Sequence, residues 1–323
     1  MKRKTVLLAV LNAAAAIAVG IGAGLLYKYY FRSDGMASRD DMKILSDKIA
    51  ALSAAVDAKV GVAAIFSTAD TLVTSSDEFP MMSVMKFHQA LAVAAWLRQN
   101  RVPLDAEVEV TPDMLPGGTW SPMRDSFPQG GSFSYRELLR YSLEYSDNNA
   151  CDILFSLSGG PERTDSYIRS LGIDGFGISC TEAMMHEDPG ISDRNRTTPL
   201  SAALLLEKFW NMRDEDPYSR FIWETMASCR TGMARIPGHI ASKASAIAHK
   251  TGTGDVTPEG RIAAVNDIGI VVLPDGSRFS LAVFISDAGC TPEQCESLIA
   301  GIAAVVYERA ASAMTEEDVE TRD

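Results

Sequence analysis

The sequence lacks the features of a metalloprotein and of a disulfide-rich protein. It has only four histidines, and its five cysteines are odd in number and dispersed over 323 residues. So few cysteines in a chain of this length do not make a disulfide framework. Cys290 and Cys295 are the only close pair, and no histidine lies near them, which argues against a zinc site. We expect buried thiols with at most one bridge, and we expect no metal.

Other familiar signatures are also missing. The sequence contains no internal repeat, no phosphate-binding loop and no dinucleotide fingerprint, so we expect no cofactor. The net charge is −12, and residues 1–35 carry five positive charges and one negative charge, which leaves −16 on the remainder. A body this acidic repels a phosphate backbone, and nucleic acid is therefore not an expected partner.

The N-terminus has the pattern of an export element. Three basic residues precede Thr5, and residues 5–26 are almost entirely apolar. This stretch is longer than a usual signal-peptide core and close to the length of a bilayer span. We expect residues 1–35 to be a signal peptide or an N-terminal membrane anchor, with any membrane attachment made through residues 5–26. The protein is thus expected to be exported to the periplasm, either released or held at the inner membrane.

The whole chain of 323 residues is 46% hydrophobic, which is enough for one large core or two modest ones. Its periodicity predicts strands and helices in separate parts of the chain. The expected strands are 60–66, 71–74, 246–251, 261–273 and 278–286. The expected helices are 40–58, 83–100, 134–143, 149–157, 164–171, 199–210, 217–228 and 291–311. Residues 112–131, rich in proline and glycine, are expected to form loops.

This order predicts an α+β fold, in which an antiparallel five-stranded sheet is built from both ends of the chain. Helices from the two ends flank the sheet, and an all-helical domain is inserted. We expect the α/β domain to comprise residues 36–85 and 229–314 and the helical domain residues 86–228. Residues 315–323 are expected to form a solvated acidic tail.

Three short motifs carry the chemistry. Ser83-x-x-Lys86 lies where a loop becomes a helix, and one helical turn brings the lysine amine beside the serine hydroxyl. That pattern alone occurs about once by chance in a chain of this length. Ser146-Asp147-Asn148 and Lys250-Thr251-Gly252 are each expected only about 0.05–0.1 times by chance. The order of the three motifs, rather than any single one, therefore predicts a serine acyl-transfer site.

The chain resembles the class A serine β-lactamases, within the wider group of penicillin-recognising serine enzymes. The resemblance covers about residues 36–312 and is closest to the branch that includes the CfxA and PER enzymes. It rests on Pro80-Met81-Met82-Ser83, Thr119-Trp120-Ser121-Pro122-Met123, Ser146-Asp147-Asn148-Asn149-Ala150, Ala248-His249-Lys250-Thr251-Gly252, Asn266-Asp267 and Leu273-Pro274-Asp275-Gly276.

The resemblance implies a role for each motif. Ser83 is expected to attack the lactam carbonyl, and the backbone N–H groups of Ser83 and Thr253 are expected to form the oxyanion hole. Lys86 is expected to assist deprotonation of Ser83, and Ser146, aided by Lys250, to protonate the departing nitrogen. The residues expected to bind substrate are Asn148, Thr251, Gly252, Thr253, Trp120 and Arg235. For Arg235 a structural role is an equal alternative.

Deacylation is expected to depend on Glu182, which aligns with the loop glutamate of the family. His186 stands where asparagine is more common, and we expect it to help position the hydrolytic water. Cys180 replaces the arginine that commonly opens this loop, so the usual salt bridge there is not expected. Whether Lys86 or Glu182 accepts the proton during acylation stays open.

The expected activity is hydrolysis of β-lactam antibiotics, with cephalosporins favoured over penicillins by analogy to the branch. Two alternatives remain. A D,D-peptidase shares the acylating residues but does not need Glu182, and a β-lactam sensor acylates without turning over. We expect a monomer whose partners are small β-lactam molecules.

Overall fold

The computed structural model describes residues 40–188, 191 and 194–320. The predicted signal peptide or anchor lies outside these residues. Within the described ranges, no helix is both long enough and apolar enough to span a bilayer. Contacts group Lys48–Asp323 as one compact unit, and the domain boundaries expected near residues 85 and 229 stay a prediction.

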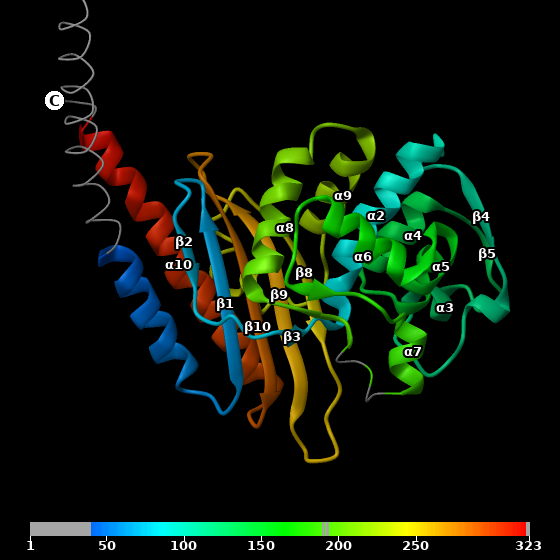
Figure 1. Ribbon diagram of the computed structural model, residues 1–323, viewed down its shortest axis with the longest axis horizontal. Helices are drawn as coiled ribbons and strands as arrows, with labels where there is room; N and C mark the ends of the chain where they lie inside the picture. Colours follow the sequence, from blue (N-terminus) through cyan, green and yellow to red (C-terminus); the bar gives the residue numbers. More distant parts are fainter. Residues whose placement is uncertain (1–39, 189–190, 192–193, 321–323) are drawn as a thin grey trace, which may run out of the picture. The chain divides into compact units, whose positions relative to one another are not determined.

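The expected sheet is present. It is five-stranded and antiparallel, in the order β2-β1-β10-β9-β8. Its strands are β1 (Lys59–Phe66), β2 (Thr71–Val73), β8 (Ala246–Thr253), β9 (Ile262–Val272) and β10 (Arg278–Ala288). Strand β2 pairs with β1, and β1 pairs on its other side with β10, which lies some 200 residues later in the chain; this confirms that the sheet combines both ends (Figure 1).

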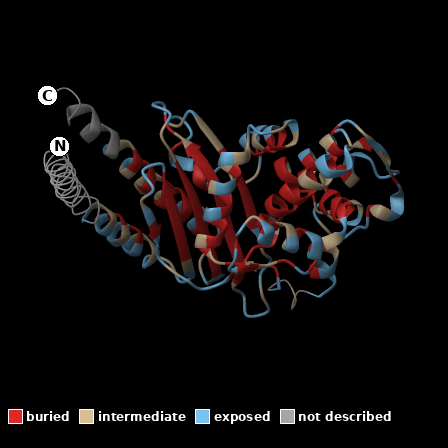
Figure 2. Ribbon diagram, turned by 45° about the horizontal axis from the view of Figure 1, so that its top comes forward, coloured by how far each residue is buried: buried red, intermediate tan, exposed pale blue. Residues whose placement is uncertain are grey.

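Both faces of the sheet are covered. Nearly every residue of β9 and β10 is buried (Figure 2), as expected when apolar side chains leave a strand on both sides. The helices α8 (Pro199–Met212) and α10 (Pro292–Glu320) both contact these strands. The backbone of α10 continues to Glu320, beyond the end expected at residue 311.

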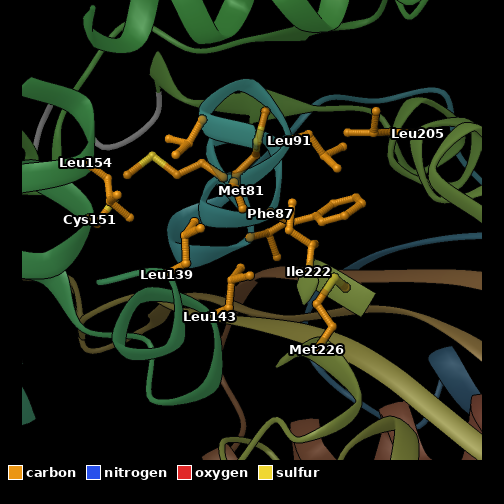
Figure 3. Close-up of a cluster of buried hydrophobic side chains, with 14 of the residues drawn as sticks. Met81, Phe87, Leu91, Leu139, Leu143, Cys151, Leu154, Leu205, Ile222 and Met226 are labelled. Carbon is orange, nitrogen blue, oxygen red and sulfur yellow. The ribbon is translucent and has the colours of Figure 1, made fainter. Parts of the chain in front are cut away.

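The helical part surrounds α2 (Met85–Asn100), whose side chains are buried over most of its length. Figure 3 shows Phe87 and Leu91 of this helix among apolar side chains from neighbouring helices. Those neighbours include α4 (Tyr135–Glu144), α5 (Asn148–Ser158), α6 (Gly160–Ser170) and α9 (Pro217–Ala227). The segment that carries the first motif is therefore anchored at the centre of the core.

The region expected to be loops contains more regular structure than predicted. It includes α3 (Pro122–Ser126), the short helix η2 (Pro112–Met114) and β5 (Gly131–Ser134), which pairs with β4 (Glu107–Val110). Further short elements are β3 (Phe79–Pro80), β6 (Phe176–Gly177), β7 (Arg196–Thr197), α7 (Glu182–Glu187), η1 (Met82–Val84) and η4 (Ile236–His239). A helix over residues 40–53 precedes the sheet, shorter than the 40–58 expected.

Candidate active site

Ser83 lies in the short helical turn η1, immediately before α2, rather than in the α-helix that was expected to start there. The backbone ahead of it is held from two sides. Asn266 of β9 donates its side-chain amide to the Pro80 carbonyl at 2.8 Å, and the Met81 N–H donates to the Asn195 carbonyl at 2.8 Å. Met82 has a φ of 48°, a strained value for a side chain of this size that the surrounding contacts must maintain.

The Ser83 hydroxyl lies between a cation and a carboxylate. It accepts a hydrogen bond from Lys86 Nζ at 2.7 Å and donates to Glu182 Oε1 at 3.3 Å. Lys86 Nζ is also 2.6 Å from the same Glu182 oxygen. The ammonium further donates to Asn148 Oδ1 at 2.6 Å and to the Ser146 carbonyl at 3.1 Å. Lys86 and Glu182 thus contact the nucleophile directly, and Ser146 and Asn148 hold the Lys86 ammonium in place.

The Ser146-Asp147-Asn148 motif has a structural role and a role in the site. Asp147 caps α5 by accepting the Ala150 N–H, and it also accepts from the Ser121 hydroxyl and the Met123 N–H. This fixes the turn in which Ser146 adopts a φ of 59°. Asn148 uses its amide oxygen on Lys86 and its amide nitrogen on Thr119 Oγ1, 2.6 Å away.

Lys250 reaches the site from β8. Its Nζ donates to Ser146 Oγ at 3.0 Å and to the Thr251 carbonyl at 2.8 Å. Burial, with the nearby charge of Lys86, lowers the pKa of the Lys250 ammonium to about 7. Gly252 is needed because β8 passes close to the nucleophile turn, where a Cβ atom would lie 2.4 Å from the Met81 carbonyl oxygen.

Glu182 begins α7, and a second carboxylate holds it there. Asp152 of α5 accepts the Glu182 N–H at 2.8 Å and the Ala183 N–H at 2.7 Å, one on each oxygen. Burial raises the pKa of the Asp152 carboxyl to about 6, against the effect of these two hydrogen bonds. The sequence analysis missed Asp152, although it stands four residues after Asn148 on the same helix and so on the same face.

Cys180 is buried at the neck of this loop, and Asn195 closes the neck. The Asn195 side chain accepts the N–H groups of Ser179 and Cys180 at 2.9 and 3.0 Å and donates to the Cys180 carbonyl at 2.8 Å. The usual arginine salt bridge was not expected at this position. The side-chain amide of Asn195 holds the neck of the loop instead, through hydrogen bonds to backbone groups.

Most of the N–H donors of the Arg235 guanidinium are paired with acceptors in the protein. Its guanidinium donates to Glu296 Oε1, to the Gly252 and Asn266 carbonyls, and to Thr253 Oγ1 at 2.8 Å. It nevertheless lines the cavity beside Ser83. Both of its expected roles, support of β8 and a positive charge at the site, are compatible with this position.

A cavity of about 1080 Å³ opens over Ser83. The expected site residues on its wall are Ser83, Trp120, Ser146, Asn148, Glu182, His186, Arg235, Thr251 and Thr253. Lys86, Lys250 and Gly252 lie behind that wall. Thr119 and Thr231, which the sequence analysis did not single out, also line it, and the Thr231 hydroxyl is 2.6 Å from that of Thr251.

Two side chains at the mouth of the cavity are exposed. Trp120 is 62% exposed and donates its indole N–H to the Tyr145 carbonyl at 3.0 Å. The His186 ring faces Gly118, where a Cβ atom would lie 3.0 Å from Nε2. Gly118 has a φ of 84°, so this contact occurs where glycine is strongly preferred.

His249, next to Lys250, is a buried structural residue. Its Nδ1 lies 3.0 Å from both oxygens of Asp267. Burial works against a charged ring, but the Asp267 charge and hydrogen bond outweigh it and raise the pKa of His249 to about 10. In the part of the chain that the structure describes, no three His, Cys, Asp or Glu side chains are placed to hold a metal ion.

Known proteins share this architecture over most of the chain. A family model described as the β-lactamase enzyme family matches residues 44–310. A β-lactamase of Bacteroides uniformis is 37% identical over 83% of this chain and 91% of its own. The extended-spectrum β-lactamase PER-1 of Pseudomonas aeruginosa is 35% identical over 82% and 87%. A solved class A β-lactamase of Bacteroides cellulosilyticus covers 84% of this chain and 99% of its own, at 35% identity and a TM-score of 0.79. The chain therefore belongs to the class A β-lactamases, the serine hydrolases that open the ring of β-lactam antibiotics.

Proposed function

We propose that the chain hydrolyses β-lactams, with cephalosporins preferred, through an acyl-enzyme on Ser83 that water releases with Glu182 as general base. The observation that carries this proposal is the double contact of the Ser83 hydroxyl. It lies 2.7 Å from the Lys86 amine and 3.3 Å from the Glu182 carboxylate. The Glu182 carboxylate can therefore accept a proton from Ser83 during acylation and from a water molecule during deacylation.

Acylation begins when Ser83 Oγ attacks the lactam carbonyl. The hydroxyl donates to Glu182 while Lys86 donates to the hydroxyl, and this pattern favours Glu182 as the proton acceptor, with Lys86 holding the oxygen in place. The backbone N–H groups of Ser83 and Thr253 stabilise the charge that develops on the carbonyl oxygen.

Ring opening needs a proton on the departing nitrogen. Ser146 supplies it, because its hydroxyl projects into the cavity and accepts a hydrogen bond from Lys250 at 3.0 Å. The lowered pKa of Lys250, about 7, suits a group that passes protons near neutral pH.

Substrate is held at both ends. Thr251, Thr253 and Arg235 bind its carboxylate, and Asn148 binds the amide of its side chain. Trp120 lines the same cavity and contributes an apolar surface to it. A volume of about 1080 Å³ is at the upper limit for small-molecule sites. That volume leaves room for cephalosporins with bulky side chains, and a relative, PER-1, is named an extended-spectrum β-lactamase.

Deacylation then requires a water activated by Glu182, with His186 helping to position it. The two hydrogen bonds that Asp152 accepts fix the start of α7 and so the direction of the Glu182 side chain. This step separates a β-lactamase from a D,D-peptidase or a sensor, which acylate with the same serine.

The test is to mix the purified full-length chain with a chromogenic cephalosporin and to follow product past one equivalent. Continued turnover is expected, with a higher kcat/KM than for a penicillin. A burst that stops at one equivalent would instead identify a sensor or a peptidase. Ser83→Ala should abolish both the burst and the turnover.

We further propose that residues 1–35 direct export of the protein to the periplasm. The protein is proposed to be a monomer there. Support for export comes from the basic start and the apolar residues 5–26. Cell fractionation and N-terminal sequencing test this. A periplasmic product that begins after residue 20 indicates cleavage, and an intact membrane-bound chain indicates an anchor. A cytoplasmic chain with an intact N-terminus would contradict export.

A further inference from the structure

Two cysteines meet at the start of α10. The sulfur atoms of Cys290 and Cys295 lie 3.4 Å apart. Cys290 is half-buried, and Cys295 is fully buried. Within the described residues, no other pair of cysteine sulfurs is in contact.

The turn between them is held in place by its own hydrogen bonds. The Thr291 N–H donates to Gln294 Oε1 at 2.9 Å, and the Gln294 N–H donates to Thr291 Oγ1 at 3.3 Å. This reciprocal cap starts the helix at Pro292, and the Cys295 N–H donates to the Thr291 carbonyl at 3.1 Å. The two thiols are therefore kept facing each other before any bond joins them.

The same turn supports the active site from behind. Glu296 follows Cys295 and accepts from Arg235 Nε at 3.1 Å. Arg235 in turn holds the Gly252 carbonyl and the Thr253 hydroxyl at the end of β8. The position of the first turn of α10 is therefore coupled to the cavity wall through the ion pair between Glu296 and Arg235.

We propose that Cys290 and Cys295 form an intrachain disulfide by exchange with a small-molecule disulfide, and that this bond fastens the first turn of α10 behind Arg235. The sulfurs need to approach from 3.4 Å to about 2.0 Å. The half-buried Cys290 side chain is the one that must rotate to close this gap, because Cys295 is fully buried within α10.

The exchange proceeds in two balanced steps. Cys290, as thiolate, attacks one sulfur of oxidised glutathione, forming a mixed disulfide and releasing one glutathione thiolate. Cys295 then loses its proton, attacks the Cys290 sulfur and releases the second glutathione. The protein loses two protons and two electrons, and the small disulfide gains them. Cys290 attacks first because burial, with the neighbouring Cys290 sulfur, raises the pKa of the Cys295 thiol to about 12.

The test counts thiols in the full-length chain after denaturation. The reduced protein should show all five cysteines, and after incubation with oxidised glutathione three should remain. The intact mass should fall by two hydrogens, and a peptide that joins Cys290 to Cys295 should appear. Five thiols after incubation, or a bridge between other cysteines, would overturn the proposal.

A second measurement is the melting temperature. The oxidised protein should melt about 4 °C above the reduced protein, and Cys290→Ser should melt at one temperature in both conditions. Cys180→Ala is the matched control, because it removes a thiol but should keep the redox-dependent shift. A shift that persists in Cys290→Ser would contradict the proposal. Cys295→Ala, which removes the buried sulfur of the pair, should likewise melt at one temperature in both conditions.

Discussion

Lys86 and Glu182 form a buried ion pair, with 2.6 Å between Nζ and Oε1. Their side chains are 0% and 10% exposed, and both groups also contact the Ser83 hydroxyl. Neither charge is free to act alone, because each is balanced by the other in a poorly solvated place. The nucleophile, its cation and its carboxylate are therefore best treated as one unit.

Asp152→Asn should slow deacylation. The amide that replaces the carboxylate offers one acceptor for the two N–H groups of Glu182 and Ala183, so the start of α7 shifts. We expect kcat to fall about 10- to 100-fold, with acyl-enzyme accumulating in the mass spectrum. Asp165→Asn is the control, since Asp165 also accepts a backbone N–H, from Ile178, besides pairing with Arg169, but does not line the cavity. An unchanged kcat in Asp152→Asn would show that Asp152 does not position Glu182.

The pH dependence of kcat/KM should report Lys250. Its folded pKa is about 7, below the usual 10.5, chiefly through burial. The charged form, which donates to the Ser146 hydroxyl, is present below this pKa and is lost as pH rises through it. We expect a basic limb near pH 7 in the wild type. The limb should be absent in Lys250→Arg, whose charge does not titrate in this range. If the limb persists in the variant, it belongs to another group.

Gly118→Ala should disturb the mouth of the cavity. The new Cβ atom would lie 3.0 Å from His186 Nε2, and the φ of 84° is unfavourable for alanine. We expect kcat to fall about threefold to tenfold as His186 is displaced. Gly117→Ala is a close control, because its Cβ atom would meet nothing within 4 Å. Equal kinetics for both variants would remove His186 from the account of deacylation.

His88 should make the protein sensitive to acid. It is fully buried in α2, and burial lowers the pKa of its ring from 6.5 to about 4, against an opposing backbone interaction with Val84. The neutral ring is favoured in the folded state, so its contribution to stability is complete above pH 6.5 and is lost as pH falls toward 4. The loss approaches about 3 kcal/mol.

His88→Leu is the corresponding variant, because it keeps an apolar side chain of similar size between Phe87 and Phe176. Urea unfolding at pH 7 and pH 4.5 should show a smaller difference in the free energy of unfolding for this variant than for the wild type. Equal differences would show that another group causes the acid sensitivity.

Much of the fold follows from local sequence patterns. A capping box of Ser134 and Glu137 starts α4 where a helix was expected over 134–143, and the turn at Asp275 and Gly276 joins β9 to β10 where strands were expected over 261–273 and 278–286. The strand pair of β4 and β5 was missed, although Glu107, Val108, Glu109 and Val110 alternate as a half-buried strand does. The prolines and glycines of residues 112–131, which closely follow Val110, favoured a prediction of loops instead.

The site was predicted less completely because its geometry depends on long-range contacts. The three motifs identify Ser83, Ser146 and Lys250 by their residue types. Asp152 and Asn195 accept hydrogen bonds from backbone N–H groups of a loop that lies 15 to 31 residues away, and no spacing rule encodes such pairs. The short strands β3, β6 and β7 likewise exist only through pairing with one another.

The central claim is that Glu182 converts a stable acyl-enzyme into a turning-over one. The direct measurement is a single experiment on purified Glu182→Ala, mixed with a chromogenic cephalosporin and followed by absorbance and intact mass. We predict at most one equivalent of product, a covalent adduct that maps to Ser83, and negligible release over the time in which the wild type completes many turnovers. Steady turnover by Glu182→Ala at the rate of the wild type, with no adduct, would contradict the account.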